Sequence, residues 1–184
     1  MRKILLLSLL AVFAFASCEE KKPQYQIDGK VVGDLNGKTV FLKELNEKGR
    51  PTADIDSAVI TEGAFKLTGS VETPAMYSLT VGGQRVNIYM FVENTPIQVT
   101  LDVANPKDNK ASSPLNDLYN THNEGLAEIH NKMNELNNKA GELQGKGELT
   151  PEVLAELQAE FQKLNEESKD YELKFIDSNP NSLV

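Results

Sequence analysis

The chain has 184 residues, with 19 Lys and Arg against 27 Asp and Glu, and a formal net charge of −8 at pH 7. An acidic balance of this kind offers no basic patch to neutralise phosphates, which excludes nucleic acid as a predicted partner. The length suits one sizeable domain or two small ones, each with a hydrophobic core.

A lipoprotein signal segment is the first predicted element, over residues 1–17. Arg2 and Lys3 give it a positive start, and an apolar stretch and two small residues follow before Cys18. The apolar stretch is shorter than the roughly 20 residues that a membrane-spanning helix needs. This arrangement resembles a bacterial lipobox, so Cys18 is the predicted lipid attachment site and residues 18–24 are a tether.

The predicted lipid also indicates where the protein acts. Anionic membrane surfaces repel a chain of this charge, so we expect it to reach a membrane through its N-terminal lipid alone. The predicted location is the bacterial cell envelope, facing the periplasm or exposed on the cell surface. Because Cys18 is the only cysteine, the exported part has no disulfide and no Cys-x-x-Cys redox centre.

Residues 25–104 are predicted to form a β-sandwich-like domain. Short segments of alternating apolar and polar residues are separated by glycine, asparagine and proline, as in antiparallel β proteins. Seven antiparallel strands are expected, at Tyr25–Val32, Thr39–Leu45, Ser57–Thr61, Ala64–Val71, Met76–Val81, Val86–Val92 and Ile97–Val103. Short strands of this number and spacing favour a sandwich or an open barrel over an α/β sheet.

A polar stretch over residues 105–114 is the predicted linker to a helical hairpin over residues 115–179, with a tail over 180–184. Three glycines within residues 141–150 are expected to break the first helix, and Thr150 and Pro151 are suited to start the second. Each helix is predicted to have about 28 residues. The apolar seam that joins them is expected to contain Leu115, Tyr119, His122, Leu126, Ile129, Met133, Leu136, Ala140, Leu143, Leu154, Leu157, Phe161, Leu164, Ser168, Tyr171 and Phe175.

Several short segments, in this order, resemble a known family. They are Ile27-Asp28-Gly29-Lys30-Val31, Gly37-Lys38-Thr39-Val40-Phe41-Leu42, Ile55-Asp56-Ser57, Gly63-Ala64-Phe65, Gly69-Ser70-Val71, Pro74-Ala75-Met76-Tyr77, Ser113-Pro114-Leu115-Asn116-Asp117 and Phe175-Ile176-Asp177-Ser178-Asn179-Pro180-Asn181-Ser182. The family is a β domain of unknown function (type 4369) found at the N-terminus of Gram-negative thiol-disulfide oxidoreductase lipoproteins. In that family a helical segment and then, usually, a thioredoxin-like domain follow.

This resemblance implies an accessory or binding module that positions a thioredoxin-like domain or its client. The sequence ends at Val184 without a Cys-x-x-Cys, so no residue inherits redox activity, and the chain is either a truncated relative or a free-standing module. The alternative is an independent envelope lipoprotein that binds a glycan, a peptide or another envelope protein.

Aromatic residues of the β domain are the candidate ligand surface. Tyr77, Tyr89 and Phe91, together with Tyr25, could line a groove that offers ring faces to a sugar or a peptide. The alternative is that these rings pack in the sheet. Glu93-Asn94 is either a polar site at a loop tip or, as we expect, part of a tight hairpin turn.

Metal and catalytic sites are not predicted. His122 and His130 are separated by too much helix to share a metal, and His122 is expected in the seam beside Tyr171 or Phe175. The aspartates at positions 34, 54 and 56 lack the spacing of a calcium loop. No nucleophile elbow or phosphate-binding glycine loop is present. We therefore expect no enzyme activity and no cofactor.

Overall fold

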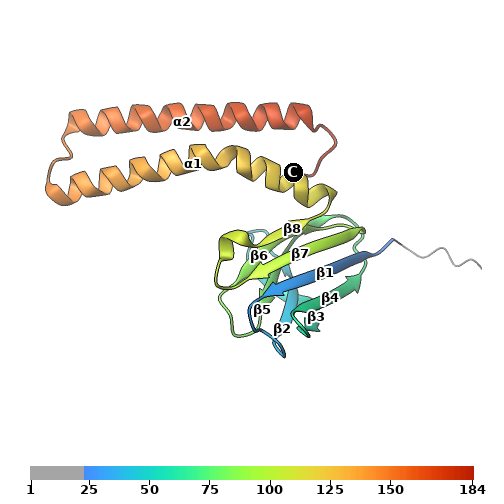
Figure 1. The fold of residues 1–184 in the computed structure, drawn as a ribbon. Helices are drawn as coiled ribbons and strands as arrows, with labels where there is room; N and C mark the ends of the chain where they lie inside the picture. The colour runs from blue at the N-terminus through green and yellow to red at the C-terminus, as the bar shows by residue number, and fades with distance from the viewer. Residues whose placement is uncertain (1–22) are drawn as a thin grey trace, which may run out of the picture.

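The computed structural model describes residues 23–184, in which a β-sandwich carries a long helical hairpin (Figure 1). The predicted signal segment and Cys18 lie outside the described residues. None of the helices in residues 23–184 is long and apolar enough to span a membrane. The sandwich and the antiparallel hairpin both confirm the predicted fold class.

Within residues 23–184, eight strands form two four-stranded sheets. The first sheet has the order β4-β1-β7-β8 and the second the order β3-β2-β5-β6. All neighbours pair antiparallel except β1 and β7, which are parallel. The strands are β1 (Tyr25–Val32), β2 (Thr39–Leu45), β3 (Pro51–Val59), β4 (Ala64–Gly69), β5 (Ala75–Val81), β6 (Asn87–Val92), β7 (Pro96–Asp102) and β8 (Lys110–Ser112).

β8 and β3 differ most from the sequence-based prediction, and β4, β5, β6 and β7 differ from it by one or two residues at their ends. The predicted linker contains a short 3-10 helix, Pro106–Asp108, and then β8, whose buried Ala111 pairs with Val99 of β7. Three residues are too few to show an alternating pattern. β3 starts at Pro51, earlier than predicted, because an edge strand accepts proline at its first position and its mostly exposed residues hide the alternation.

The sandwich core is formed by the inward faces of both sheets, with Ile27, Leu42, Leu79 and Ile97 fully buried. One feature of this core is a glycine that pairs with an aromatic ring across two strands. Gly29 of β1 lies directly opposite Phe65 of β4, and a Cβ at Gly29 would lie 2.0 Å from the ring. The ring therefore occupies space that any other residue at position 29 would fill.

The hairpin consists of α1 (Pro114–Lys146, 33 residues) and α2 (Pro151–Ser178, 28 residues). The Ser113 and Thr150 hydroxyls cap their first turns. The predicted break at residues 141–150 begins too early, because α1 continues through Gly141 to Lys146 and is capped by Gly147, whose φ is 72°. An interior glycine costs only about 1 kcal/mol, which the packing of this end of the hairpin offsets.

The seam between the helices centres on Leu136 of α1 and on Leu157 and Leu164 of α2, which are buried. Partly buried residues extend it in both directions, among them Phe161 and those that follow: Ile129, Met133, Ala140, Leu143, Leu149 and Val153. Leu154, predicted in the seam, is 40% exposed instead. The face of α2 that packs on α1 begins at Val153 and continues through Leu157. On α2 the predicted seam begins one residue later, at Leu154.

Candidate functional site

The three aromatic residues of the predicted ligand surface do not share one surface. Tyr77 of β5 packs against the sandwich core and lies opposite Met90. Tyr89 and Phe91 of β6 lie on the outer face of the second sheet, because β6 alternates sides. Phe91 is 8% exposed, with its ring 5.6 Å from that of Tyr119 on α1. Tyr89, at 44%, is the one of the three that is open to solvent.

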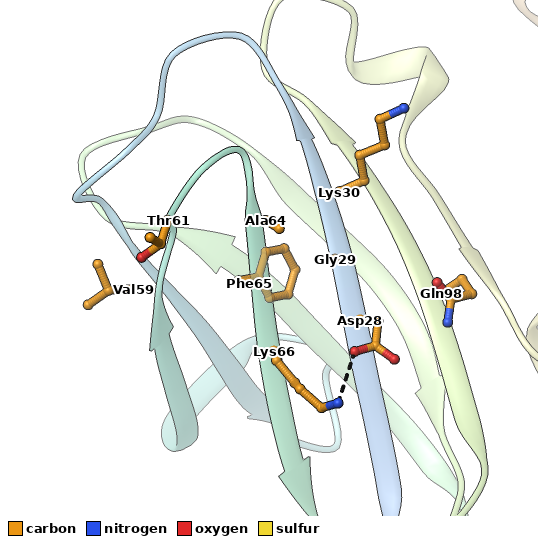
Figure 2. Close-up of a pocket in the computed structure, with 9 residues that line it drawn as sticks. All are labelled: Asp28, Gly29, Lys30, Val59, Thr61, Ala64, Phe65, Lys66 and Gln98. Carbon is orange, nitrogen blue, oxygen red and sulfur yellow. Dashed lines mark ion pairs between the residues drawn. The ribbon is translucent and has the colours of Figure 1, made fainter.

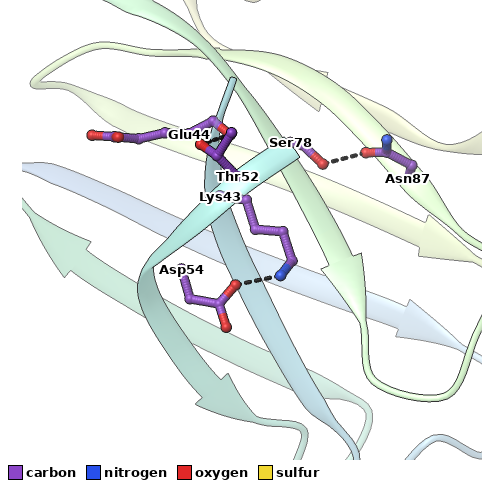
Figure 3. Close-up of polar contacts among 6 residues, drawn as sticks. All are labelled: Lys43, Glu44, Thr52, Asp54, Ser78 and Asn87. Atoms are coloured by element: carbon purple, nitrogen blue, oxygen red, sulfur yellow. Dashed lines mark hydrogen bonds and ion pairs between the residues drawn. The ribbon is translucent and has the colours of Figure 1, made fainter. Parts of the chain in front are cut away.

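A row of polar residues crosses the same outer face from Tyr89. Strand register places Tyr89 opposite Ser78 of β5, Ser78 opposite Lys43 of β2, and Lys43 opposite Asp54 of β3. Figure 3 shows that the row is internally bonded: Lys43 forms an ion pair with Asp54, and the Ser78 hydroxyl donates to Asn87 Oδ1 at 2.5 Å. These polar groups already have partners, so the row leaves the Tyr89 ring as its most available feature.

A shallow hollow of about 470 Å³ lies over β1 and β4 on the other sheet (Figure 2). Its one carboxylate belongs to Asp28, which accepts a hydrogen bond from Gln26 at 2.6 Å and lies 3.4 Å from Lys66 Nζ. The Gln26 hydrogen bond, and then the Lys66 charge, hold the pKa of Asp28 below its usual value. An ionised, paired carboxylate of this kind is suited to holding β1 and β4 together and not to proton transfer.

The remaining titratable candidates are dispersed. Asp54 pairs with Lys43, whereas Asp34 accepts from Asn36 at 3.3 Å. His122 lies between the helices as predicted, with its ring centroid 4.7 Å from that of Phe175, and His130 is exposed. Within residues 23–184 no group of three His, Cys, Asp or Glu side chains is placed to hold a metal ion.

Tyr25 gives the sandwich a pH dependence at alkaline pH. Burial, and then the charge of Asp56, raises the pKa of Tyr25 from 10.0 to about 12. Between these values the unfolded chain releases the phenolic proton while the folded chain keeps it, so the free energy of unfolding falls as pH rises above 10. We expect Tyr25→Phe to weaken this fall in urea unfolding between about pH 8 and pH 11. Tyr89→Phe, which alters an exposed phenol, is the control, and equal pH dependence in both variants contradicts the assignment.

The most elaborate polar cluster joins the sandwich to α1. Asn116, in the first turn of α1, is 1% exposed and faces the edge of β6. Its Oδ1 accepts from the main-chain N–H of Phe91 at 2.8 Å, and its Nδ2 donates to the main-chain carbonyl of Phe91, also at 2.8 Å. A side-chain carboxamide thus stands where the peptide group of a neighbouring strand would stand.

Glu93, in the segment after β6, belongs to the same cluster. We call the contacts of Asn116 and Glu93 between the sandwich and α1 the joint. Its Oε1 accepts from the Ser113 hydroxyl at 2.7 Å and from the main-chain N–H of Leu115 at 3.0 Å, at the positive end of α1. Asn94 in turn holds Val71, accepting from its N–H at 2.9 Å and donating to its carbonyl at 2.7 Å. The predicted hairpin turn at Glu93-Asn94 is wrong, because β6 and β7 belong to different sheets.

The far end of the hairpin returns to this joint. Asn179 and Pro180, after α2, lie beside Glu93 and Leu115, and the end of the chain lies near the start of α1 in Figure 1. The sequence predicted a helix start at residue 115, one residue after the observed start at Pro114. Sequence reasoning missed the role of Asn116 and considered Glu93-Asn94 only as a polar loop tip or a hairpin turn, because no local pattern pairs a helical asparagine with a strand 25 residues away.

A second candidate surface lies on the hairpin itself. Leu154, Leu157 and Phe161 of α2 and Leu136 and Ala140 of α1 line a groove of about 280 Å³, whose rim carries the amides of Asn137, Gln158, Gln162 and Asn165. An apolar floor with a polar rim is typical of a surface that binds a protein segment.

Comparison with known proteins gives one match. The family model described as Domain of unknown function (DUF4369) matches residues 25–119. The match includes the sandwich and the first turns of α1, and therefore Tyr119 as well as Glu93 and Asn116 of the joint. No curated protein and no solved structure shows significant similarity to the chain.

Proposed function

Because the chain belongs to the DUF4369 family, we propose that it is a lipid-anchored accessory module of the cell envelope that holds a partner polypeptide and catalyses no reaction. The module is related to the N-terminal domain of thiol-disulfide oxidoreductase lipoproteins. Its partner is a thioredoxin-like domain or the client of one. The observation that carries this proposal is the joint formed by Asn116 and Glu93.

The joint makes the hairpin a fixed arm. An α-helix of 33 residues is about 50 Å long, and without the joint it would swing freely on the segment after β8. The direction of α1 is instead fixed by two contacts with Phe91. Buried Asn116 forms two hydrogen bonds with its main chain, and the Tyr119 ring packs on its side chain. The start of β1 and the turn between α1 and α2 lie on opposite sides of the molecule in Figure 1. An anchor before β1 would therefore leave the tip of the arm free to reach a partner.

The apolar groove between α1 and α2 favours a second candidate function, an independent envelope lipoprotein that binds a peptide or a protein. Photo-crosslinking in native cells, with a photoreactive amino acid in place of the exposed Gln144 at the tip of α1, separates the two candidates. An adduct with a thioredoxin-like protein, or with a client of one, supports the first. Adducts with other envelope proteins alone favour the second.

Lipid attachment is the part of this proposal that a single substitution tests. No other residue of the chain offers a thiol, so Cys18→Ala is expected to abolish incorporation of an alkyne fatty acid and to release the protein from the membrane fraction. Ser17→Ala, which alters the neighbouring residue without removing the thiol, is expected to keep both. Label and membrane retention that persist in Cys18→Ala would rule out anchoring through this residue.

A further inference from the structure

The Asn116 contact shows which way the main chain of β6 faces. The N–H and carbonyl of Phe91 point away from β5, toward Asn116. In an antiparallel pair, residues alternate between bonding the neighbouring strand and pointing away from it. Asn87 and Tyr89 have the same parity as Phe91, and lie opposite Thr80 and Ser78 in the same register. Their main-chain N–H and carbonyl groups therefore also point outward, along the free edge of the second sheet.

This part of the edge is open in the region that the structure describes. Asn87 is exposed and Tyr89 is 44% exposed, whereas Phe91 at the covered end is 8% exposed. Asn116 takes the place of a neighbouring strand at Phe91 only, two residues after Tyr89 in β6. Two N–H and two carbonyl groups thus continue the row that Asn116 begins.

The other sheet edges carry features that discourage pairing with another chain. β3 begins with Pro51, contains two register shifts and presents Asp54 and Asp56. β4 carries Lys66 and ends in a glycine, and β8 has three residues. β6 has none of these features, since its sequence Asn87-Ile88-Tyr89-Met90-Phe91-Val92 contains no charge, proline or glycine. An unprotected edge beside protected ones is expected where pairing is used.

We propose that the edge of β6 at Asn87 and Tyr89 binds an extended peptide segment of another envelope polypeptide, which pairs with β6 as an added strand and ends against Asn116. A row of alternating main-chain donors and acceptors matches an extended peptide backbone, and Asn116 already presents the same amide group to Phe91. The peptide residue opposite Tyr89 lies on the outer face, where an aromatic or β-branched side chain packs best against that ring. The inference rests on the proposed function and supplies the chemistry of the partner.

A matched pair of substitutions at Asn87 isolates the edge. Asn87 is the first residue of β6 and its N–H points outward, so proline there removes a donor from the edge and none from the pairing with β5. Both Asn87→Pro and Asn87→Ala lose the hydrogen bond from Ser78, and only Asn87→Pro loses the edge N–H. Unfolding curves of both variants establish that each is folded.

The probe is a library of random peptides displayed on phage, selected on the exported chain carrying Cys18→Ala. Selected peptides are expected to bind Asn87→Pro about tenfold more weakly than Asn87→Ala, the effect of losing one main-chain hydrogen bond and leaving the peptide carbonyl that accepted it without a partner. They are also expected to slow hydrogen exchange at the Tyr89 amide. In the free protein we expect this amide to exchange fast and the Phe91 amide, which donates to Asn116, to exchange slowly.

Three results would overturn this inference. They are selection of no peptide, equal binding by Asn87→Pro and Asn87→Ala, and a dimer of the chain that Asn87→Pro abolishes, which would make a second copy the occupant of the edge. None of these results bears on lipid attachment at Cys18. Failure of the edge site is therefore distinguishable from failure of the proposed function.

Discussion

Gly29→Ala is expected to destabilise the sandwich by about 2–3 kcal/mol, the upper part of the range of about 1–3 kcal/mol that an added methyl group costs in a packed core. The new Cβ would lie 2.0 Å from the ring of Phe65, which is 6% exposed and has little room to move. Urea unfolding followed by circular dichroism measures the loss. The urea concentration at the midpoint of unfolding is expected to fall for the whole sandwich, because Gly29 lies on a central strand.

Two further substitutions show that the cause is the ring and not glycine as such. Gly141→Ala makes the same chemical change in α1, where nothing lies within 4 Å of the added Cβ, and is expected to stabilise by up to about 1 kcal/mol. Phe65→Leu is expected to recover part of the loss when combined with Gly29→Ala, since it removes the clash. Equal effects of Gly29→Ala and Gly141→Ala would mean that Phe65 does not lie over Gly29.

Leu136→Asp and Phe161→Asp are each expected to cost several kcal/mol, because each places an unpaired charge in the apolar seam of the hairpin. Leu136 is 9% exposed and belongs to the same cluster as Phe161 on the opposite helix. The two substitutions are therefore expected to be non-additive in a double-mutant cycle measured by urea unfolding.

Glu156→Gln is the control for the seam. Glu156 lies on the exposed side of α2, so its substitution is expected to change the free energy of unfolding by roughly 0.5 kcal/mol or less. Full additivity of the two seam substitutions, or seam charges tolerated as well as Glu156→Gln, would show that α1 and α2 do not pack as described.

The sequence predicted the elements that repeat a pattern over many residues. β1 and β2 have the predicted bounds, and both helices occur where spacings of three and four recur. Alternation of apolar residues in β6 and β7 also predicted the inward faces correctly. Each of these elements buries one face, so its apolar residues recur at the spacing of a helix or a strand, and this spacing can be recognised in the sequence.

Features that depend on distant partners escaped the prediction. The parallel pairing of β1 with β7 joins segments about 70 residues apart, and nothing in either strand encodes the direction of its neighbour. The sequence does not distinguish Tyr77, Tyr89 and Phe91, which are all aromatic strand residues, yet Tyr77 packs against the core, Tyr89 is open to solvent and Phe91 is covered by α1. The glycines near the end of α1 led to the prediction of an early break. The sequence of α1 alone does not show the packing that offsets their cost, because that packing comes from the second helix.

The central claim, that the hairpin is an arm fixed to the sandwich, depends on Asn116. Its removal leaves the N–H and carbonyl of Phe91 without partners, at a cost of about 1–3 kcal/mol. Asn116→Ala is therefore expected to loosen the joint. Asn137→Ala makes the same change at an exposed position of α1 beyond the joint and is the matched control.

The most direct measurement is the distance distribution between spin labels on introduced cysteines at Thr68 of β4 and Lys139 of α1, both exposed, by pulsed electron paramagnetic resonance. Cys18→Ala removes the only native thiol, so the labels are specific. One narrow distribution is expected in the parent chain and in Asn137→Ala, and a broad one in Asn116→Ala. A broad distribution in the parent chain, or a narrow one in a folded Asn116→Ala variant, would contradict the account.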